Sequence, residues 1–197
     1  MENMINYIKD INENIYKMLI IQHSNFLEEI ENQTDSICKF SVKNDWKTLQ
    51  YVKNQNDDIC KFAVSINESA LQFVKNQNEE ICKLAISQNY YALQFVKNQT
   101  EDICKFAVLQ NGLALLYVKN QTYEICKIAV TQNGLALEFV YDRTEDICKI
   151  AVTQNGLALE FVLNQTYEIC KLAILENPDA KKKFKKNWNH IGIIGLS

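Results

Sequence analysis

Seven cysteines are the residues of this chain with the most distinctive chemistry, because each lies 22 residues after the previous one. Thiols at a regular spacing could form disulfides or bind a metal ion, and both require sulfur atoms that converge. Equivalent positions in stacked helical layers lie about 8–10 Å apart, whereas a disulfide needs Cα atoms within roughly 7 Å. We therefore expect reduced, buried cysteines and no metal site. The seven positions are Cys38, Cys60, Cys82, Cys104, Cys126, Cys148 and Cys170.

A ladder of lysines runs beside the cysteines and could form a positive stripe for a phosphate backbone. Its members are Lys17, Lys39, Lys61, Lys83, Lys105, Lys127, Lys149 and Lys171. An acid precedes several of them by four residues, which is the favourable order for an ion pair on a helix. We expect such pairs at Asp57–Lys61, Glu79–Lys83, Glu101–Lys105 and Glu145–Lys149. The pairs favour local neutralisation over a nucleic-acid stripe, and the single arginine, Arg143, supports the same interpretation.

Glutamine and asparagine also recur and could present a polar recognition surface. The alternative is that they satisfy backbone groups in the turns and bond across layers, which we favour. One glutamine set is Gln88, Gln110, Gln132 and Gln154, and the other is Gln55, Gln77, Gln99, Gln121 and Gln165. His23 and His190 lie at opposite ends of the chain and share no site. Without a Ser/His/Asp set, a phosphate-binding glycine loop or a metal-ligand spacing, we expect no catalytic residue, no cofactor and no enzyme.

Two columns of capping residues position these side chains by dividing each repeat into two short helices. Asn133 and Asn155 belong to a column of Asn and Asp residues that favours a helix start, with Pro178 following Asn177 in the last copy. Thr144 belongs to a second cap column, with acids in the next turn. The fifth full copy is predicted to have a helix over residues 134–141, and the next one a helix over residues 145–154. Left-handed asparagines are predicted to close the second helices. These are Asn32, Asn54, Asn76, Asn98, Asn120 and Asn164, with Asp142 in the same column.

A fixed period of this length is typical of repeat architectures, so the prediction is an all-α fold, an α-solenoid of stacked two-helix repeats. We expect one domain over residues 1–197, with a half-repeat cap at 1–14, repeats at 15–176, and a C-terminal cap and tail at 177–197. Ala180, Phe184 and Trp188 predict one longer, basic amphipathic capping helix. Its lysines are an alternative anchor for a membrane or nucleic acid. They are Lys181, Lys182, Lys183, Lys185 and Lys186.

The composition excludes several classes of protein. The chain has 197 residues and a formal net charge of -3, so no strong field draws it to nucleic acid. Its apolar runs are far shorter than the roughly 20 residues of a membrane span. The first residues lack the apolar core of a secretory signal. We expect a cytoplasmic protein, in the host cytoplasm or the virion if it is viral.

Two columns change from polar to apolar along the chain and predict a protein-contact strip, although repeat drift with deeper burial would produce the same change. In one column Tyr91, Leu113, Leu135 and Leu157 replace Asn25, Lys47 and Ser69. In the turn between repeats, Lys53/Asp57, Lys75/Glu79 and Lys97/Glu101 give way to Lys119/Tyr123, Tyr141/Glu145 and Leu163/Tyr167.

The motif ICKxAVxQNGLALxFVKNQT resembles a family of short uncharacterised helical repeats from mimivirus-like giant DNA viruses, some protists and bacteria. The resemblance extends from Ile15 to Asn177 and implies a fold and an origin, but no activity. Together with the repeat architecture it favours a non-enzymatic protein-interaction scaffold. A nucleic-acid-associated protein that uses the lysine ladder and the basic C-terminal helix is an alternative, and a structural homo-oligomer is another. The identity of a protein partner does not follow from the sequence.

Overall fold

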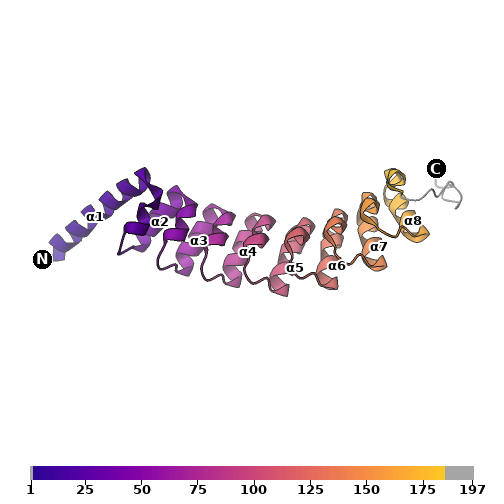
Figure 1. Ribbon diagram of the computed structural model, residues 1–197, viewed down its shortest axis with the longest axis horizontal. Coiled ribbons are helices and arrows are strands. Elements are labelled where there is room, and N and C mark those ends of the chain that lie inside the picture. Colours follow the sequence, from indigo (N-terminus) through magenta and orange to yellow (C-terminus); the bar gives the residue numbers. More distant parts are fainter. Residues whose placement is uncertain (1, 185–197) are drawn as a thin grey trace. The chain divides into compact units, whose positions relative to one another are not determined.

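The computed structural model describes residues 2–184, with side chains from residue 12 onward. It consists of two compact units, Met1–Asn98 (unit 1) and Gln99–Ser197 (unit 2). Every regular element in the described part of either unit is a helix (Figure 1). The predicted all-α repeat solenoid is thus confirmed, whereas the expectation of a single domain stays a prediction.

Each repeat pairs an α-helix with a 3₁₀-helix (η). Unit 1 contains α1 (Glu2–Gln22), η1 (Ser24–Glu29), α2 (Asp35–Asn44), η2 (Trp46–Tyr51), α3 (Asp57–Ile66), η3 (Glu68–Phe73), α4 (Glu79–Gln88) and η4 (Tyr90–Phe95). Unit 2 contains α5 (Glu101–Gln110), η5 (Gly112–Tyr117), α6 (Tyr123–Gln132), η6 (Gly134–Phe139), α7 (Glu145–Gln154), η7 (Gly156–Phe161), α8 (Tyr167–Glu176) and η8 (Pro178–Lys183). Within each unit, successive α-helices pack against one another and so do successive 3₁₀-helices.

The second helix of each repeat is a 3₁₀-helix and is shorter than predicted. The first helix was predicted over residues 145–154 and α7 has these bounds. The second begins at Gly134 as predicted but ends at Phe139, after six residues. Six α-helical residues would span about 9 Å, whereas six 3₁₀ residues span about 12 Å. The stretched form better matches the ten-residue α-helix beside it, which is about 15 Å long.

Both predicted cap columns are confirmed. The Thr144 hydroxyl accepts a hydrogen bond from the Ile147 N–H at 3.4 Å, and the Asn78 side chain accepts one from the Ile81 N–H at 2.9 Å. Asn133 serves two helices at once. Its N–H donates to the Ala129 carbonyl at 2.9 Å, which ends α6. Its side chain accepts from the Leu135 N–H at 3.0 Å, which begins η6.

The predicted role of the asparagines after each 3₁₀-helix is wrong. The residue that closes η3 is Val74, in extended conformation with φ -67° and ψ 119°. Its N–H donates to the Leu71 carbonyl at 3.2 Å. A valine fits because the chain leaves the helix without entering left-handed backbone, and the buried side chain joins the core. Asn76 lies two residues further on, in an exposed bend.

The glutamine that follows each such asparagine joins one layer to the next, as predicted. Gln77 donates from Nε2 to the Leu71 carbonyl of its own repeat at 2.8 Å and to the Phe95 carbonyl of the next repeat at 3.0 Å. Its Oε1 accepts from the Lys97 N–H at 2.8 Å. One amide therefore satisfies three backbone groups. Gln55 makes the same three bonds one layer earlier.

Arg143 interrupts this ladder of bridging glutamines. Its Nε donates to the Leu137 carbonyl at 3.0 Å and its Nη2 to the Glu138 carbonyl at 2.7 Å. Both acceptors belong to its own repeat. A guanidinium has no acceptor atom, so it cannot bond the Leu163 N–H as a glutamine would. The bond across this layer boundary is thereby lost.

The N-terminal prediction is wrong. Residues 1–14 were expected to form a separate half-repeat, but α1 is one continuous helix over Glu2–Gln22. The sequence explains the difference, because the position 22 residues before the bridging Gln33 is Ile11. Without an amide to hold a turn there, the stretch contains no Gly or Pro and continues as helix.

The C-terminal helix also ends earlier than predicted. The helix η8 stops at Lys183, and Phe184 closes it in extended conformation, in the place of the earlier valines. Gln165 explains this, because its Nε2 donates to the backbone carbonyl of Lys183 at 2.9 Å. A backbone acceptor works with any side chain, so the lysine substitutions do not disturb the repeat. Trp188 lies outside the described residues.

Three glycines of unit 2 allow close packing between layers. The Gly134 N–H donates to Oε1 of Gln154 in the next repeat at 2.5 Å. A Cβ on Gly134 would lie 2.3 Å from the Ala151 carbonyl oxygen. Gly112 and Gly156 are confined in the same way. Glycine is needed at these positions because the layers approach closely, and not because the backbone has a positive φ. This agrees with the prediction that the asparagine before each glycine begins a helix.

Replacing Gln77 by methionine tests the glutamine ladder. Methionine has a similar volume but no amide, so it removes three hydrogen bonds and leaves Phe95 C=O and Lys97 N–H without their partner. We expect the free energy of unfolding to fall by about 2 kcal/mol. Urea denaturation followed by circular dichroism measures it.

Two further variants serve as controls for this prediction. Gln72 bonds only within its own helix, to Ser69, so Gln72→Met should change stability by less than about 0.5 kcal/mol. Arg143→Gln restores the ladder and should raise stability by about 1 kcal/mol. Equal losses for Gln77→Met and Gln72→Met would contradict the bridging role.

Replacing Gly134 by alanine tests the close approach of layers. The added methyl group meets the Ala151 backbone, which cannot rotate away, so we expect a loss of about 1–3 kcal/mol in the same denaturation assay. The matched control is Glu68→Ala, at the same repeat position in unit 1, where a side chain is already accommodated. A Gly134→Ala protein as stable as the parent would contradict the packing argument.

Candidate protein-interaction surface

The seven cysteines are free and buried, as predicted. Burial raises the pKa of Cys38 to about 11, and the nearby charge of Asp35 adds to the rise. Burial likewise raises the pKa of Cys170 to about 11. Several of these thiols face the bridging glutamines, for example Cys126, whose Sγ lies 3.5 Å from Oε1 of Gln121. A protonated, enclosed thiol is a poor nucleophile, so this ladder belongs to the core.

The lysine ladder is largely neutralised on the helices, as predicted. Ion pairs join Lys83 to Glu79 at 2.5 Å, Lys105 to Glu101 at 2.9 Å and Lys149 to Glu145 at 2.9 Å. These pairs neutralise the lysines of the ladder on α4, α5 and α7.

The predicted pair Asp57–Lys61 is wrong. Lys61 instead reaches Glu80 of the next repeat at 2.7 Å. Asp57 has a shorter side chain than glutamate, and its carboxylate accepts a hydrogen bond from Nδ2 of Asn78 at 2.9 Å. The acid is thus engaged across the layer rather than along its own helix.

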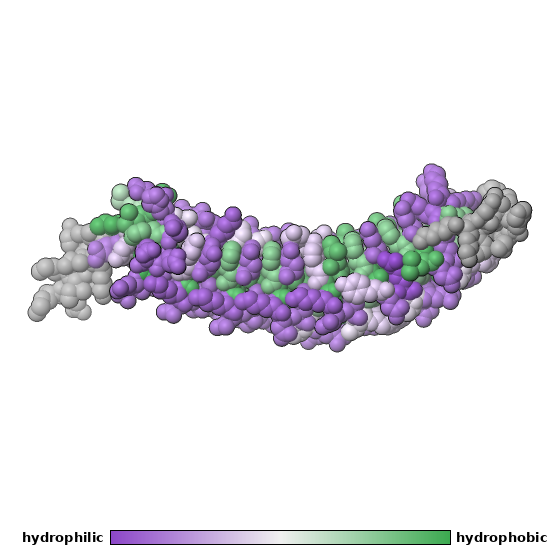
Figure 2. All heavy atoms as spheres, viewed as in Figure 1, coloured by the Kyte–Doolittle hydropathy of each residue, from purple (hydrophilic) through white to green (hydrophobic). Residues whose placement is uncertain are grey.

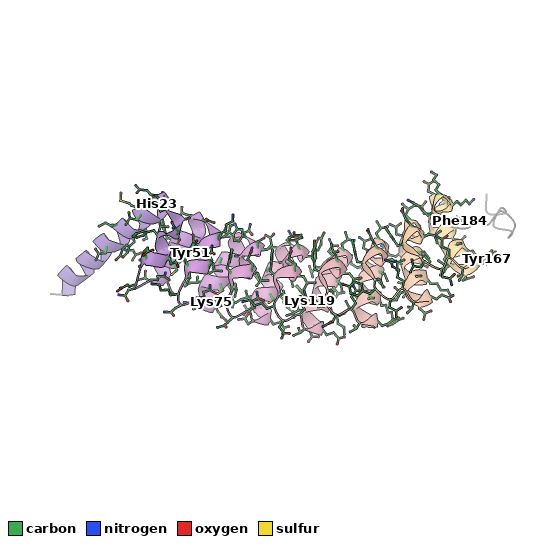
Figure 3. The ribbon with its side chains drawn as sticks, in the orientation of Figure 1. His23, Tyr51, Lys75, Lys119, Tyr167 and Phe184 are labelled. Atoms are coloured by element: carbon green, nitrogen blue, oxygen red, sulfur yellow. The ribbon has the colours of Figure 1, made fainter. Side chains whose placement is uncertain are left out.

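The lysines of the turns in unit 1 bond to backbone carbonyls. Nζ of Lys75, labelled in Figure 3, donates to the Val52 carbonyl at 2.9 Å and to the Lys53 carbonyl at 3.1 Å. Nζ of Lys53 donates to the Ile30 carbonyl at 2.9 Å. These ammonium groups thus donate to carbonyl groups at the end of the 3₁₀-helix of the preceding repeat.

The structure separates the predicted contact strip into two sets. Leu113, Leu135 and Leu157 are half-buried near the start of their 3₁₀-helices, whereas Tyr91, in unit 1, is 44% exposed. The second set is exposed and lies in the turns or at the start of α-helices, as Tyr167 does in Figure 3. Its members are Tyr123, Tyr141, Leu163 and Tyr167. The two sets come from different elements, and in unit 2 the second set provides the more open apolar surface.

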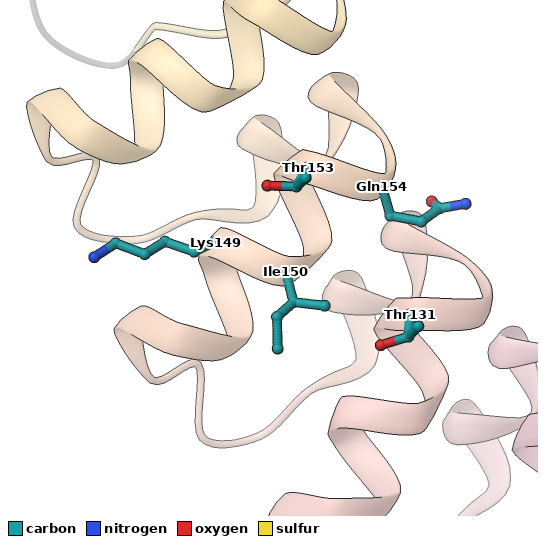
Figure 4. Close-up of a pocket in the computed structure, with 5 residues that line it drawn as sticks. All are labelled: Thr131, Lys149, Ile150, Thr153 and Gln154. Atoms are coloured by element: carbon teal, nitrogen blue, oxygen red, sulfur yellow. The ribbon is translucent and has the colours of Figure 1, made fainter.

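Two hollows lie between α-helices of unit 2. One, of about 350 Å³, lies between α5 and α6 and is lined by Leu109, Ile128 and Lys127 among others. The other, of about 370 Å³, lies between α6 and α7 (Figure 4). Ile150 extends from α7 into the space beside α6, with Thr131 across from it. Thr131 lines both hollows, so they are neighbours.

Apolar side chains of the α-helices extend this hollowed region into a surface that we call the unit 2 α-face. Figure 2 shows bands of apolar side chains over the repeats of unit 2 and similar bands over those of unit 1. Leu109 and Leu175, 59% and 60% exposed, occupy a repeat position that holds Lys43, Ser65 and Ser87 in unit 1. The members of the unit 2 α-face are Leu109, Tyr123, Ile128, Ile150, Tyr167 and Leu175.

The sequence prediction included Tyr123 and Tyr167 of this face but missed its other members. The missed signal is the column that reads Lys43, Ser65, Ser87, Leu109, Thr131, Thr153, Leu175, which turns less polar along the chain. Ile128 and Ile150 gave no signal, because their column is apolar in every full copy. Only the packing shows that these side chains stay half-buried and form the floors of the hollows.

The predicted basic C-terminal surface is partly neutralised. Lys182 pairs with Asp179 at 2.8 Å, and Lys183 pairs with Glu160 of the preceding repeat at 2.5 Å. Lys181 is exposed, and Lys185 and Lys186 lie outside the described residues. In residues 2–184 there is no cluster of metal-ligating side chains and no helix long and apolar enough to cross a membrane.

Other hollows offer less to a partner. In unit 1 a polar hollow of about 410 Å³ is lined mainly by amides and lysines that already bond to backbone. A smaller cavity of about 130 Å³ lies beside Arg143 and Cys148, where the glutamine ladder is interrupted. The unit 2 α-face is therefore the strongest candidate for an interaction surface.

Comparison with known proteins identifies the repeat. The model of the family described as "Domain of unknown function (DUF4116)" matches residues 56–100, 78–122, 100–144 and 122–166, each match displaced by one repeat from the last. No curated protein and no solved structure shows significant similarity to the chain.

Titration of the cysteines tests their burial. Because burial raises the pKa of the thiols, the folded chain holds protons that the unfolded chain releases from about pH 9. This contribution to stability is complete below pH 9 and is lost as the pH rises toward 11. We expect thiolate absorbance near 240 nm to develop about 2 pH units higher in the native protein than in urea for Cys38, Cys60 and Cys170. Native thiols that titrate as in urea would contradict the burial.

Proposed function

The chain belongs to the DUF4116 family, and we propose that it is a non-enzymatic scaffold that binds a partner protein through the unit 2 α-face. The observation that carries the proposal is the pair of hollows between α5, α6 and α7, whose lining includes the exposed Leu109 and the half-buried Ile128 and Ile150. Grooves with apolar floors and polar rims are characteristic of binding surfaces in helical repeat proteins.

The distribution of polar groups supports a binding role rather than catalysis. The recurrent Asn, Thr and Gln side chains cap helices or bridge layers, as Gln121 does for Tyr141 N–H at 3.0 Å. The recurrent thiols are enclosed and protonated. The chemistry of the repeat is thus engaged in folding, which leaves shape and apolar contact as the means of recognition.

The remaining parts of the proposal concern compartment and origin. Seven buried, unpaired cysteines suit a reducing compartment, so we place the protein in the cytoplasm. The lysine-rich, arginine-poor composition suits an AT-rich genome such as that of a giant virus. Against the nucleic-acid alternative stand the ion pairs of Lys83, Lys105 and Lys149.

Substitutions on the unit 2 α-face test the proposal. Leu109→Ser combined with Leu175→Ser restores the polarity of the unit 1 repeats and should not affect the core, because both side chains are exposed. In quantitative pull-downs from native cell extract, we expect partner proteins to be recovered at least about fivefold less with this variant, which corresponds to about 1 kcal/mol.

Leu116→Ser is the matched control, since Leu116 is 49% exposed on η5 and lies outside the face. Equal recovery by the double variant and the parent would refute the proposed surface. Light scattering on the same proteins tests whether the partner is another copy of the chain. In that case the molar mass in solution would halve in the double variant and not in the control.

A further inference from the structure

The helix α1 presents apolar side chains to solvent on the side turned away from the stack. Ile15, Met18 and Ile21 are all exposed, Met18 by 64%. Ile20, two residues after Met18 and therefore on the opposite side of the helix, is buried in the core. A face with several exposed large apolar side chains is characteristic of an interface.

The other repeats show what normally covers this face. Ile15 occupies the repeat position of Ile37 and Ile169. Both of these isoleucines are buried, and Ile169 is buried in α8, after which no further α-helix is described. The preceding repeat therefore covers this position, rather than the following one. Ile15 is 47% exposed because no repeat precedes α1 in the described residues. The exposed face of α1 thus lies where a further helix would pack.

The spacing of apolar residues along α1 predicts the kind of helix that packs there. Five of them follow one another at alternating intervals of four and three residues, as the a and d positions of a heptad repeat do. They are Met4, Ile8, Ile11, Ile15 and Met18, which we call the α1 stripe. A period of 3.5 residues keeps one seam against one partner helix over its whole length. The pattern therefore indicates a coiled coil rather than the packing of a short repeat helix.

An α-helix of the repeat is too short to cover the α1 stripe. The helix α1 has 21 residues, whereas α2, which packs against it, has 10. Figure 1 shows that α1 extends beyond α2 toward the N-terminus. The stripe runs from Met4 to Met18, about 21 Å along the axis, whereas ten helical residues span about 15 Å. Among the described helices, α1 alone has the length to match. A second copy of α1 is thus the occupant that the chain itself offers.

We propose that α1 forms a two-stranded coiled coil with α1 of a second copy of the chain. Ile15 and Met18 lie in the seam, and Ile21 packs at its edge. Both copies use the same surface, as in two-fold symmetric dimers. The pairing involves unit 1 only, so it is independent of the function proposed for the unit 2 α-face.

The charges of α1 are compatible with self-pairing. In a coiled coil the positions beside the seam of one helix lie near those of the other, so like charges there would repel an identical copy. In the described half of α1 these positions are uncharged, and they are held by Asn12, Asn14, Leu19 and Ile21. Glu13 pairs with Lys17 at 2.8 Å and also accepts a hydrogen bond from the Ser36 hydroxyl of α2. The charges of this half are therefore engaged on the side of the stack, away from the seam.

Light scattering of the full-length protein after size exclusion tests the proposal. At about 10 μM we expect twice the mass of one chain. Ile15→Lys combined with Met18→Lys places ammonium groups in the seam, where they would lose hydration without gaining a partner. We expect the dissociation constant of the dimer to rise at least about 100-fold. Both side chains are exposed and lysine suits a helix, so the variant should fold, which circular dichroism checks.

The matched control is Ile66→Lys combined with Leu116→Lys. Both residues are exposed apolar side chains outside α1, and the control adds the same charge as the seam variant. It should remain a dimer. Equal loss of the dimer in both double variants would reduce the effect to net charge and overturn the proposal.

Co-purification of differently tagged chains decides whether α1 pairs with α1. A chain with the two seam lysines, mixed with a parent chain, leaves one intact α1 stripe in each mixed pair. Because each stripe requires the other in a coiled coil, we expect the mixed pair to be recovered at least about tenfold less than the parent pair. If α1 docked on a different surface of the second copy, one intact stripe would suffice. Undiminished recovery of the mixed pair would therefore overturn the coiled coil.

The unit 2 variants separate this inference from the proposed function. Leu109→Ser with Leu175→Ser should keep the dimer, because neither residue lies on α1. Loss of the dimer in that variant would assign self-association to the unit 2 α-face and overturn the pairing of α1. A monomeric parent protein would overturn the pairing as well, and the pull-down then decides on the scaffold independently.

Discussion

The amide of one glutamine per repeat is the interaction on which the stacking of this protein depends. Each of η2 to η7 is closed by a valine in extended conformation, so the last carbonyls of the helix and the next N–H are left without helical partners. Gln77 satisfies such groups in its own repeat and in the following one with a single side chain. A short helix that is unstable alone is thereby joined to its neighbour by directional bonds as well as by apolar contact.

Because the stacking is held by a few columns, the remaining positions are free to differ between repeats. The columns that recur most regularly are the caps, the bridging glutamine, which Arg143 replaces in one repeat, and the buried Ile, Cys, Ala, Leu and Val. The outward positions of the α-helices make no such contacts. This division explains how α3 can carry Asp57 and Ser65 where α5 and α6 carry Leu109 and Tyr123 without any change of fold.

Most of the repeat was predictable from the sequence, because capping is a local interaction that leaves Asn, Thr and acids at fixed positions. The bounds of α7 and the start of η6 follow from Thr144 and Asn133 alone. What escaped prediction depends on neighbouring layers. Gly134, for example, is required by the Ala151 carbonyl of the next repeat. Lys183 was misjudged because only its backbone takes part in the ladder.

The candidate site was predictable only in part. The exposure of Tyr123 follows from its position in the repeat, whereas the roles of Ile128 and Ile150 as floors of the two hollows depend on packing between helices.

The core and the surface of unit 2 have different periods. The core repeats every layer, whereas the first residue of the α-helices alternates as Glu101, Tyr123, Glu145 and Tyr167, so the surface repeats every two layers. Gain or loss of a single repeat would preserve the core but would bring two like helices together. Gain or loss of two repeats would preserve both. The alternating side chains are exposed, so the packing of the core does not determine them.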